Sequence, residues 1–551
     1  MENPPVEPFD EIALALSGGG FRAASFTLGC LSYLQRVSFK GAPMLTRVKF
    51  ISSASGGSIT NIYYSLCNQE GTDFKTFFQA LFDFLNGDDT IAKVFDNLQS
   101  DEPWKERPDK GRNLINAFSL TYDKTLFNGK LLGDIATLKN SHIDEICVNA
   151  TDFTYGITFR FQTGSGRNGN GEITLKDAAA MKLKLGDILA ASSCFPLGFE
   201  PIMLPFDFAH SGITCEEIKN ATTNEQVVGL MDGGITDNQG IYSFLEAERR
   251  KCNSNKEGKG FDTFLYCDVA SPYIGQYTLP VEKKSLLGSI SIQRYIQLLK
   301  YVSPALLIVF SYLLINVTTA WWLIVLTTIA SLFTTLYVIS AVLYNNAKKK
   351  SKKTQSTWLI TLFKFINKLL FTPSSSVKQM LDARIKSAGI LVSDVYLKQI
   401  RRLTIKTLLQ NEKSGKKWQL HSKGVFLYEL SDINTERSLK PFEGLKDKNG
   451  QPVEMNPSAA MKDIANEARL MDTTLWFDEN HVNSQKREKL IAAGQFTMCY
   501  NLIEYICYLE RNKLATTEIL ELRNRLVDDW NLFQVQPMSM STPATFNVWS
   551  K

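Results

Sequence analysis

Apolar and polar positions alternate in a regular way along the first half of the chain. Up to about residue 275, short apolar runs of strand length are followed by segments whose apolar positions recur at helical spacing. The runs at 11–17 and 48–55 predict strands, and each leads into a predicted helix. This alternation favours an α/β layered fold with a mostly parallel central sheet flanked by helices. We expect this domain to span residues 8–275.

Further elements are predicted within the same domain. Residues 145–164 have the pattern of a strand pair, and residues 261–270 that of a single strand. The glycine-rich stretch 164–172 predicts a loop. The residues 229–234 read as the end of a strand that runs into two glycines. Together these elements supply enough strands for one continuous sheet.

The middle of the chain has a different pattern, because residues 301–347 contain no charged residue. One membrane span needs about 20 apolar residues, so this stretch has room for two. Asn316 and a threonine pair suit a turn, and Trp321 and Trp322 suit a membrane interface. We therefore expect an insertion at 276–355 that holds two transmembrane helices, at about 301–319 and about 321–344.

Basic residues flank the apolar stretch on both sides, and they are Lys283, Lys284, Arg294 and Lys300 before it and 348–353 after it. Positive flanks favour the cytoplasm, so both ends are expected on one side of the membrane. This requires an even number of crossings and predicts a multi-pass hairpin with the domain at 8–275 in the cytoplasm. One long tilted span is an alternative that would separate the two halves of the chain. A buried pair of core helices is another.

The remaining residues, 356–551, are predicted to be mainly helical and to pack on the catalytic domain. One strand is expected within 417–431. The segment 356–371 has apolar residues at helical spacing, with Lys364 and Lys368 on the other face. It either lies along an anionic membrane surface or packs on the protein body.

The composition narrows the class of protein. With 44% hydrophobic and 21% charged residues, the chain is expected to fold, and a net charge of +5 is small for 551 residues. A nucleic-acid partner is therefore not expected. The nine cysteines form no C-x-x-C pair, which indicates buried thiols in a reducing compartment. The N-terminal twenty residues lack the pattern of a secretory signal.

A glycine-rich loop follows the first predicted strand. Gly18 to Ala23 fits G-x-G-x-x-A, the fingerprint of dinucleotide-binding loops. Such a site also needs an acidic residue at the end of the next strand, to bind the ribose hydroxyl. That strand ends in serines at 52–55 instead. The loop is therefore better interpreted as a binding site for another negative charge.

Two further motifs carry candidate catalytic groups. Ser55 lies in a sequence similar to the nucleophile elbow G-x-S-x-G, with Ser53 in place of the first glycine. The positions two before and two after the nucleophile must be small, and Ser53 and Gly57 are. Asp232 directly follows an apolar strand and precedes two glycines. None of the four histidines lies in a catalytic context, and a Ser-Asp dyad needs none.

These motifs, in this order, resemble those of the patatin-like phospholipases, whose patterns are G-G-G-x-R/K, G-x-S-x-G and D-G-G/A. Here they read Gly18-Gly19-Gly20-Phe21-Arg22, Ser53-Ala54-Ser55-Gly56-Gly57 and Asp232-Gly233-Gly234. The segments 148–161 and 189–202 also fit the family, with Cys194 where it usually has alanine. The resemblance covers residues 10–275 and implies a patatin-like layered fold.

The resemblance implies acyl-ester hydrolysis by a Ser-Asp dyad, with Ser55 as nucleophile, Asp232 as general base and an acyl-enzyme intermediate. The implied oxyanion-hole donors are the backbone N–H groups of Gly18, Gly19 and Gly20. Arg22 is expected to hold this loop, to attract an anionic head group or to form a structural ion pair. The chemistry requires no metal and no cofactor.

The function expected from these features is that of a membrane-associated phospholipase that degrades lipids by cleaving carboxylic esters. Its partners are then a membrane phospholipid substrate and the lipid bilayer. The sequence specifies neither the head group nor the oligomeric state. One alternative is a regulated or catalytically weak membrane-bound effector or scaffold with the same fold. Another is a nucleotide-binding α/β protein, which the missing ribose-binding acid disfavours.

Overall fold

The computed structural model describes residues 7–136, 140–196, 198–256, 258–270, 278, 288–316, 321–353, 371–410, 415–431, 433 and 436–548. The chain divides into two compact units. The first is formed by Met1–Ile274 together with Asp394–Lys551, and the second by Gly275–Ser393. The predicted insertion ended at residue 355, whereas the second unit continues to Ser393. The C-terminal residues from 394 onward belong to the same unit as the catalytic motifs.

The first unit is built on a ten-stranded sheet whose main path runs β12-β11-β1-β4-β5-β6-β7-β8. The strands are β1 Ile12–Leu16, β4 Val48–Ala54, β5 Glu145–Asp152, β6 Ile157–Gln162, β7 Asn168–Gly169, β8 Thr174–Leu175, β9 Ile202–Leu204, β10 Val228–Asp232, β11 Thr263–Asp268 and β12 Ser422–Phe426. Pairing is parallel from β12 to β5 and antiparallel from β5 to β8. The predicted layered fold with a mostly parallel core is thus confirmed.

Both faces of the sheet are covered, and β1 shows why its sequence is apolar throughout. Ile12, Leu14 and Leu16 join the larger hydrophobic core, whereas Ala13 and Ala15 face a second core on the other side. Successive residues of a strand point to opposite faces, so in a strand buried on both faces no position faces solvent. The helices of the larger core include α1 Gly20–Arg36, α2 Gly56–Gln69 and α9 Leu185–Ser193. Those of the second include α12 Ile241–Ser254, α17 Leu397–Gln410 and α18 Gly415–His421.

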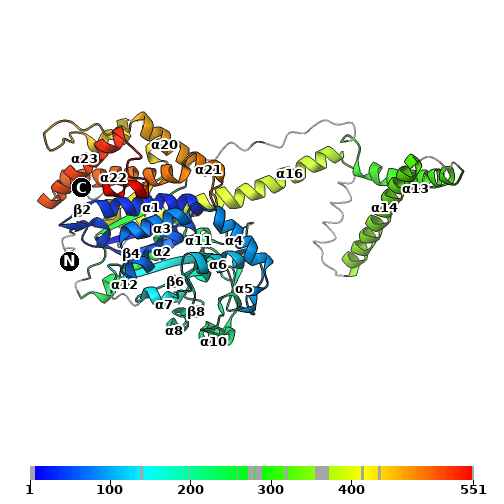
Figure 1. The fold of residues 1–551 in the computed structure, drawn as a ribbon, viewed down its shortest axis with the longest axis horizontal. Coiled ribbons are helices and arrows are strands. Elements are labelled where there is room, and N and C mark those ends of the chain that lie inside the picture. The colour runs from blue at the N-terminus through cyan, green and yellow to red at the C-terminus, as the bar shows by residue number, and fades with distance from the viewer. Residues whose placement is uncertain are drawn as a thin grey trace. The chain divides into compact units, whose positions relative to one another are not determined.

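The C-terminal region completes this layered unit. β12 pairs in parallel with β11 and extends the sheet. The first residues of the segment predicted as a strand, 417–421, are helical instead and belong to α18. Helix α22 Lys486–Arg511 packs along α1 (Figure 1). A Cβ added at Gly29 would lie 2.1 Å from the Ile491 carbonyl oxygen, and one at Gly494 would lie 2.2 Å from that of Phe26. The two helices therefore meet backbone to backbone at their glycines.

The other helices of the first unit surround these elements. They are α3 Phe74–Phe84, α4 Asp88–Gln99, α5 Glu102–Lys105, α6 Leu114–Thr125, α7 Leu132–Ala136, α8 Asp177–Ala180, α10 Cys215–Ala221, α11 Gly234–Asp237, α19 Glu436–Leu439, α20 Ala459–Leu470, α21 Glu479–Asn483 and α23 Thr517–Val535. A separate two-stranded sheet pairs β2 Ser38–Phe39 with β3 Ala42–Pro43.

The second unit contains α13 Ile292–Asn316 and α14 Trp321–Lys353, which pack on each other, and α16 Ser374–Ile390. Ile292–Asn316 and Trp321–Ile339 each have a mean hydropathy of 2.0, and both are long enough to cross a membrane. Only 6% and 11% of their apolar windows are buried, which disfavours the alternative of a buried core pair. The predicted amphipathic helix at 356–371 lies almost entirely outside the described residues.

Candidate active site

Ser55 stands at a sharp turn between strand and helix. β4 ends at Ala54 and α2 begins at Gly56, so Ser55 alone makes the turn, with φ 50° and ψ −125°. A non-glycine residue in such a conformation costs on the order of 1–3 kcal/mol, so surrounding contacts must hold it. Its N–H donates to the carbonyl oxygen and the Oγ of Ser192, at 3.1 and 3.0 Å. The Ser55 side chain is only 9% exposed.

The small residues around Ser55 are required by close packing. A Cβ added at Gly57 would lie 2.4 Å from the Leu16 carbonyl oxygen, and one at Gly56 would lie 2.0 Å from the Gly20 carbonyl oxygen. Ser53 occupies the position where the elbow pattern has glycine. Its buried Oγ accepts hydrogen bonds from Ser58 Oγ at 3.0 Å and Asn61 Nδ2 at 2.9 Å. Serine therefore fits this position because its hydroxyl is hydrogen-bonded.

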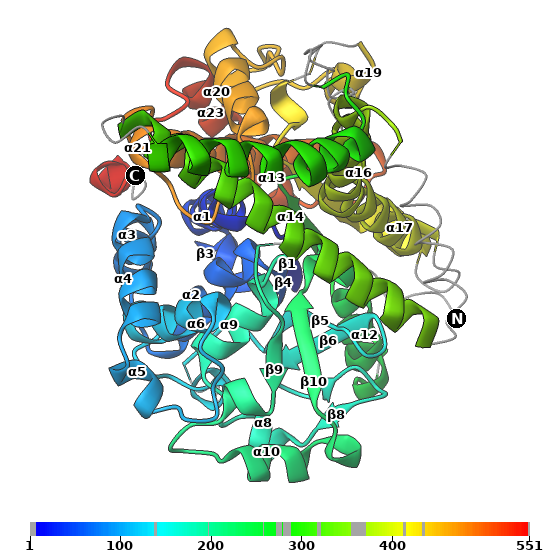
Figure 2. The same cartoon turned by 90° about the vertical axis from the view of Figure 1, so that its right-hand side faces the viewer.

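The register of the sheet brings Asp232 to Ser55. One edge of β5 is shared by two strands: its first half pairs in parallel with β4, and its second half pairs antiparallel with β10. Ala54 lies opposite Asn149, and Asp232 lies opposite Ala150. The ends of β4 and β10 therefore meet head to head at neighbouring positions of β5. Figure 2 shows β10 with β9 alongside it.

Ser192, near the end of α9, binds both turns. Its carbonyl oxygen accepts the N–H groups of Ser55 and of Gly233, each at 3.1 Å. The preceding N–H, that of Asp232, donates to the Cys194 carbonyl oxygen at 3.1 Å. One short stretch of chain thus fixes the serine and the aspartate relative to each other. It belongs to the segment 189–202 that the sequence singled out, although the role of Ser192 was not foreseen.

The Asp232 carboxylate is buried and has few hydrogen-bond donors. Its Oδ1 accepts the Gly234 N–H at 2.7 Å, and the Ser55 hydroxyl lies near enough to lower the pKa of the carboxyl. Burial raises the pKa of Asp232 to about 6, against the lowering effects of these two contacts and of Arg401. An ionised carboxylate with a pKa near neutrality, next to a hydroxyl, is suited to accept a proton from it.

The glycine loop lies against Ser55. A Cβ added at Gly18 would lie 3.0 Å from the Ser55 Cβ. The Gly18 N–H donates to the Asn238 carbonyl oxygen at 3.1 Å, so it is already engaged. Gly19 and Gly20 have φ of 145° and 61°, and within the described part of the chain their N–H groups have no acceptor. Of the three predicted donors, Gly19 and Gly20 are therefore the two available for a developing oxyanion.

Arg22 holds a C-terminal segment against this loop. Its Nη1 donates to the Met471 carbonyl oxygen and its Nη2 to Thr473 Oγ1 at 3.4 Å. Next to it, the Phe21 N–H donates to the Thr474 carbonyl oxygen at 2.8 Å. Burial, together with the positive charge of Arg401, lowers the pKa of Arg22 to about 10. Of the roles expected for Arg22, these contacts are those of a residue that holds the loop.

The four histidines have other partners. His142 is hydrogen-bonded to Tyr64 and Val48, and His210 to the Lys182 carbonyl oxygen. His421 is hydrogen-bonded to Tyr505, and His481 pairs with Asp478. The sequence predicts surface or structural histidines, and these contacts are structural ones. Among the residues that the structure describes, no group of three histidine, cysteine or acidic side chains is placed to hold a metal ion. All nine thiols are free, and seven are buried.

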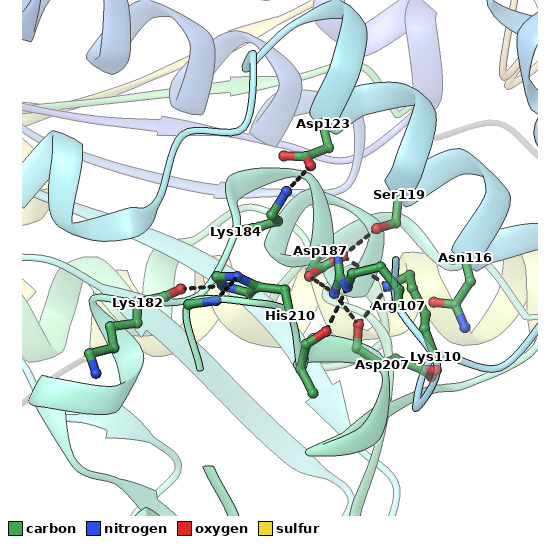
Figure 3. A network of polar contacts seen from close by, with 12 residues as sticks. Arg107, Lys110, Asn116, Ser119, Asp123, Lys182, Lys184, Asp187, Asp207 and His210 are labelled. Carbon is green, nitrogen blue, oxygen red and sulfur yellow. Dashed lines mark hydrogen bonds and ion pairs between the residues drawn. The ribbon is translucent and has the colours of Figure 1, made fainter. Parts of the chain in front are cut away.

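A buried ionic network anchors the other end of α9, and the sequence did not indicate it. Asp187 on α9 accepts from Arg107 Nη2 at 2.7 Å and Lys110 Nζ at 2.9 Å, and also from Ser119 Oγ (Figure 3). Arg107 and Lys110 also donate to the Asp207 carbonyl oxygen. Because α9 carries Ser192, this network supports the contact that joins the two catalytic turns.

Comparisons with known proteins place these motifs in a family. Residues 14–245 match the profile described as Patatin-like phospholipase. Among solved structures, the chain is similar to VipD from Legionella pneumophila, with 13% identity, coverage of 94% of this chain and 92% of that one, and a TM-score of 0.26. A TM-score this low carries no argument about this chain. No curated protein matches the sequence.

Proposed function

We propose that the chain is a membrane-associated lipid acylhydrolase that cleaves carboxylic ester bonds of phospholipids, since residues 14–245 match the family model described as Patatin-like phospholipase. The observation that carries the proposal is geometric: the turns at Ser55 and Asp232 lie at neighbouring positions of β5, and the N–H groups of Ser55 and Gly233 share the Ser192 carbonyl oxygen. The family supports a lipid hydrolase. The dyad, the ester specificity and the membrane anchor are the proposed part.

In the proposed reaction, Ser55 Oγ attacks the ester carbonyl carbon while Asp232 takes the hydroxyl proton. The tetrahedral intermediate collapses, the bond to the alcohol oxygen breaks, and Asp232 gives its proton to the leaving lysolipid. A water molecule then attacks the acyl-enzyme and loses a proton to Asp232. The fatty acid leaves, and Ser55 Oγ recovers its proton from Asp232. Protons and bonds balance over the cycle without a further reactant.

The carbonyl oxygen gains negative charge in each tetrahedral intermediate. We assign its stabilisation to the N–H groups of Gly19 and Gly20, because the Gly18 N–H is bound to Asn238. Preorganised N–H groups of this kind contribute about 10²- to 10³-fold each to the rate. Arg22 contributes indirectly, by holding the segment 471–474 against the loop.

The second unit is proposed to anchor the enzyme in the membrane through α13 and α14. Both helices expose large apolar side chains, for example Ile315 on α13 at 77% and Trp321 on α14 at 75%. Exposed apolar surface of this extent is typical of a membrane or protein interface. With basic flanks on both sides, the proposed topology is a hairpin whose ends and catalytic unit lie in the cytoplasm. Cell fractionation of a variant lacking residues 301–347 tests this, and continued membrane binding would contradict it.

An active-site probe tests the catalytic proposal. A fluorophosphonate should label the purified chain and fail to label Ser55→Ala, and the wild type should release fatty acid from phospholipid vesicles. A wild type that binds vesicles without reacting with the probe would support the alternative of a membrane-bound scaffold. Absence of labelling together with tight dinucleotide binding would contradict the proposal and support the alternative of a nucleotide-binding protein.

A further inference from the structure

Asn238 lies buried between the two loops of the proposed active site. Its backbone carbonyl oxygen accepts the Gly18 N–H. Its amide nitrogen would lie 3.1 Å from a Cβ added at Gly18 and 2.4 Å from one added at Gly234. The same added Cβ at Gly234 would lie 2.8 Å from Asp232 Oδ1. The Asn238 side chain thus fills the space between the glycine loop and the aspartate turn.

Arg401, on α17, fixes the orientation of this side chain. Its Nε and Nη2 both donate to Asn238 Oδ1, at 3.1 and 2.7 Å, and its Nη2 lies 3.4 Å from the Gly18 carbonyl oxygen. Its Nη1 is 3.6 Å from Asp268 Oδ1. A guanidinium held at two nitrogens by one oxygen leaves the amide little freedom to flip. The Asn238 NH₂ group is therefore directed toward Gly18 and Asp232.

A second contact fixes the register of α17. Thr404 Oγ1 donates to Gln239 Oε1 at 2.6 Å, and Gln239 Nε2 donates to Asp268 Oδ2 at 2.6 Å. Consecutive residues after the aspartate turn, Asn238 and Gln239, are thus held by side chains one turn apart on α17. This arrangement places Arg401 reproducibly beside the loop, because α17 cannot slide without breaking both contacts.

We propose that Arg401 and Asn238 form a positioning pair for the hydrolysis proposed above, on which this inference rests. Arg401 binds the Asn238 side chain and the Gly18 carbonyl oxygen, and the Asn238 backbone carbonyl holds the Gly18 N–H. The loop thereby presents Gly19 and Gly20 to the oxyanion. Neither residue of the pair needs to touch the reacting atoms. The pair also brings a fixed positive charge close to the general base.

The charges near Asp232 come from several elements. Arg401 on α17 favours the ionised form of Asp232 and lowers the pKa of that carboxyl. The Cys194 thiol, after α9, stays neutral, because burial raises its pKa well above the ordinary value. Asp268 on β11 and Arg22 on α1 lie around Arg401 with opposite signs. The loss of Arg401 therefore removes a cation that keeps Asp232 ionised.

Three variants of the full chain test the pair, with kcat and KM measured on phosphatidylcholine vesicles from about pH 4 to about pH 9. Arg401→Met should lower kcat by about 10- to 100-fold with KM unchanged, because the loop is misplaced. Its acidic limb should also move to higher pH, by about one unit or less. Arg401→Lys should keep the acidic limb near that of the wild type, because the charge remains, but not the full kcat. The matched control is Arg402→Met, whose side chain is exposed and has no hydrogen bond or ion pair within the described residues.

A double variant shows whether the two residues act together. Asn238→Ala keeps the backbone bond to Gly18 but removes the Oδ1 acceptor of Arg401. It should lower kcat about as much as Arg401→Met, and the pair of changes should lower it no further, because both break the same contact. Two independent losses that multiply would overturn the pair. So would an Arg401→Met enzyme indistinguishable from Arg402→Met, or one whose kcat falls only as its folded fraction falls, with an unmoved acidic limb.

The wild type separates this inference from the proposed function. A wild type that neither hydrolyses vesicles nor reacts with a fluorophosphonate overturns the proposed function, and the positioning role falls with it. An active wild type whose activity is lost in Ser55→Ala, combined with a silent Arg401→Met, overturns the positioning pair alone.

Discussion

Two buried carboxylates of the same unit have opposite surroundings. Asp187 contacts two cations and a hydroxyl, whereas the Asp232 carboxylate accepts one backbone N–H, with Ser55 and Arg401 as its other favourable neighbours. Burial alone raises the pKa of Asp187, but Arg107 and Lys110 outweigh it and hold that pKa well below its usual range. At Asp232 burial prevails and the pKa rises to about 6. The ionic network stabilises a permanent charge, whereas the catalytic pair leaves a charge under-compensated and able to bind a proton.

The largest expected effect is on catalysis at Asp232. Asp232→Asn keeps the size of the side chain but removes the base, so kcat/KM should fall by about 10²- to 10⁴-fold. Hydrolysis of phospholipid vesicles by the purified variant measures this. The matched control is Asp237→Asn, a buried carboxyl on α11 that the mechanism does not use. Equal losses in the two variants would show that Asp232 is a structural residue.

The next largest effect is on stability at Asp187. Asp187→Asn leaves the cations of Arg107 and Lys110 buried without their partner, which costs about 3–5 kcal/mol of unfolding free energy. Denaturant unfolding measures the loss. Asp101→Asn, which breaks the exposed ion pair with Arg112, should cost about 1 kcal/mol or less. Similar losses for the buried and the exposed pair would contradict the distinction between the two carboxylates.

The stability effect at Asp232 should have the opposite sign. The pKa of Asp232 is raised in the folded state. Between about pH 4 and about pH 6 the folded state therefore holds a proton that the unfolded state has already released. Stability contributed by this proton is present below about pH 4 and is lost as the pH rises through about 6. Asp232→Asn should therefore unfold at higher denaturant concentration than the wild type at pH 7, by about 1–3 kcal/mol. A destabilised variant would refute the idea of an under-compensated charge.

The smallest effect is the pH dependence of the wild type. Only the ionised Asp232 accepts the Ser55 proton, so kcat/KM should fall about tenfold per pH unit below about pH 6 and be level above it. The Asp187 network should contribute no limb in this range, because its carboxyl stays ionised. An activity limb near pH 4, the ordinary range for aspartate, would mean that burial does not raise this pKa in the working enzyme.

Local patterns sufficed for the parts of the site that are contiguous in sequence. The strand-to-helix turn at Ser55 and the glycine loop could be predicted, because small residues directly after an apolar strand are typical of a tight turn into a helix. The meeting of β4 with β10 could not, since it depends on how both strands share one edge of β5. Ser192, Asn238 and Arg401 also left no local signal. Their roles arise from contacts between residues far apart in sequence: 137 positions separate Ser192 from Ser55, and 163 separate Arg401 from Asn238.

The glycine contact between α1 and α22 has a consequence for synthesis. A ribosome releases residues 1–274 and then the apolar second unit well before α22, β12 or the segment 471–474 exist. Until then, the face of α1 that receives Ile491 stays uncovered and Phe21 lacks the acceptor on Thr474. Domains generally fold as units, so this one waits for its last portion. The proposed active site is therefore completed after the apolar helices have emerged, and a nascent chain carries Ser55 in an unfinished form of that site.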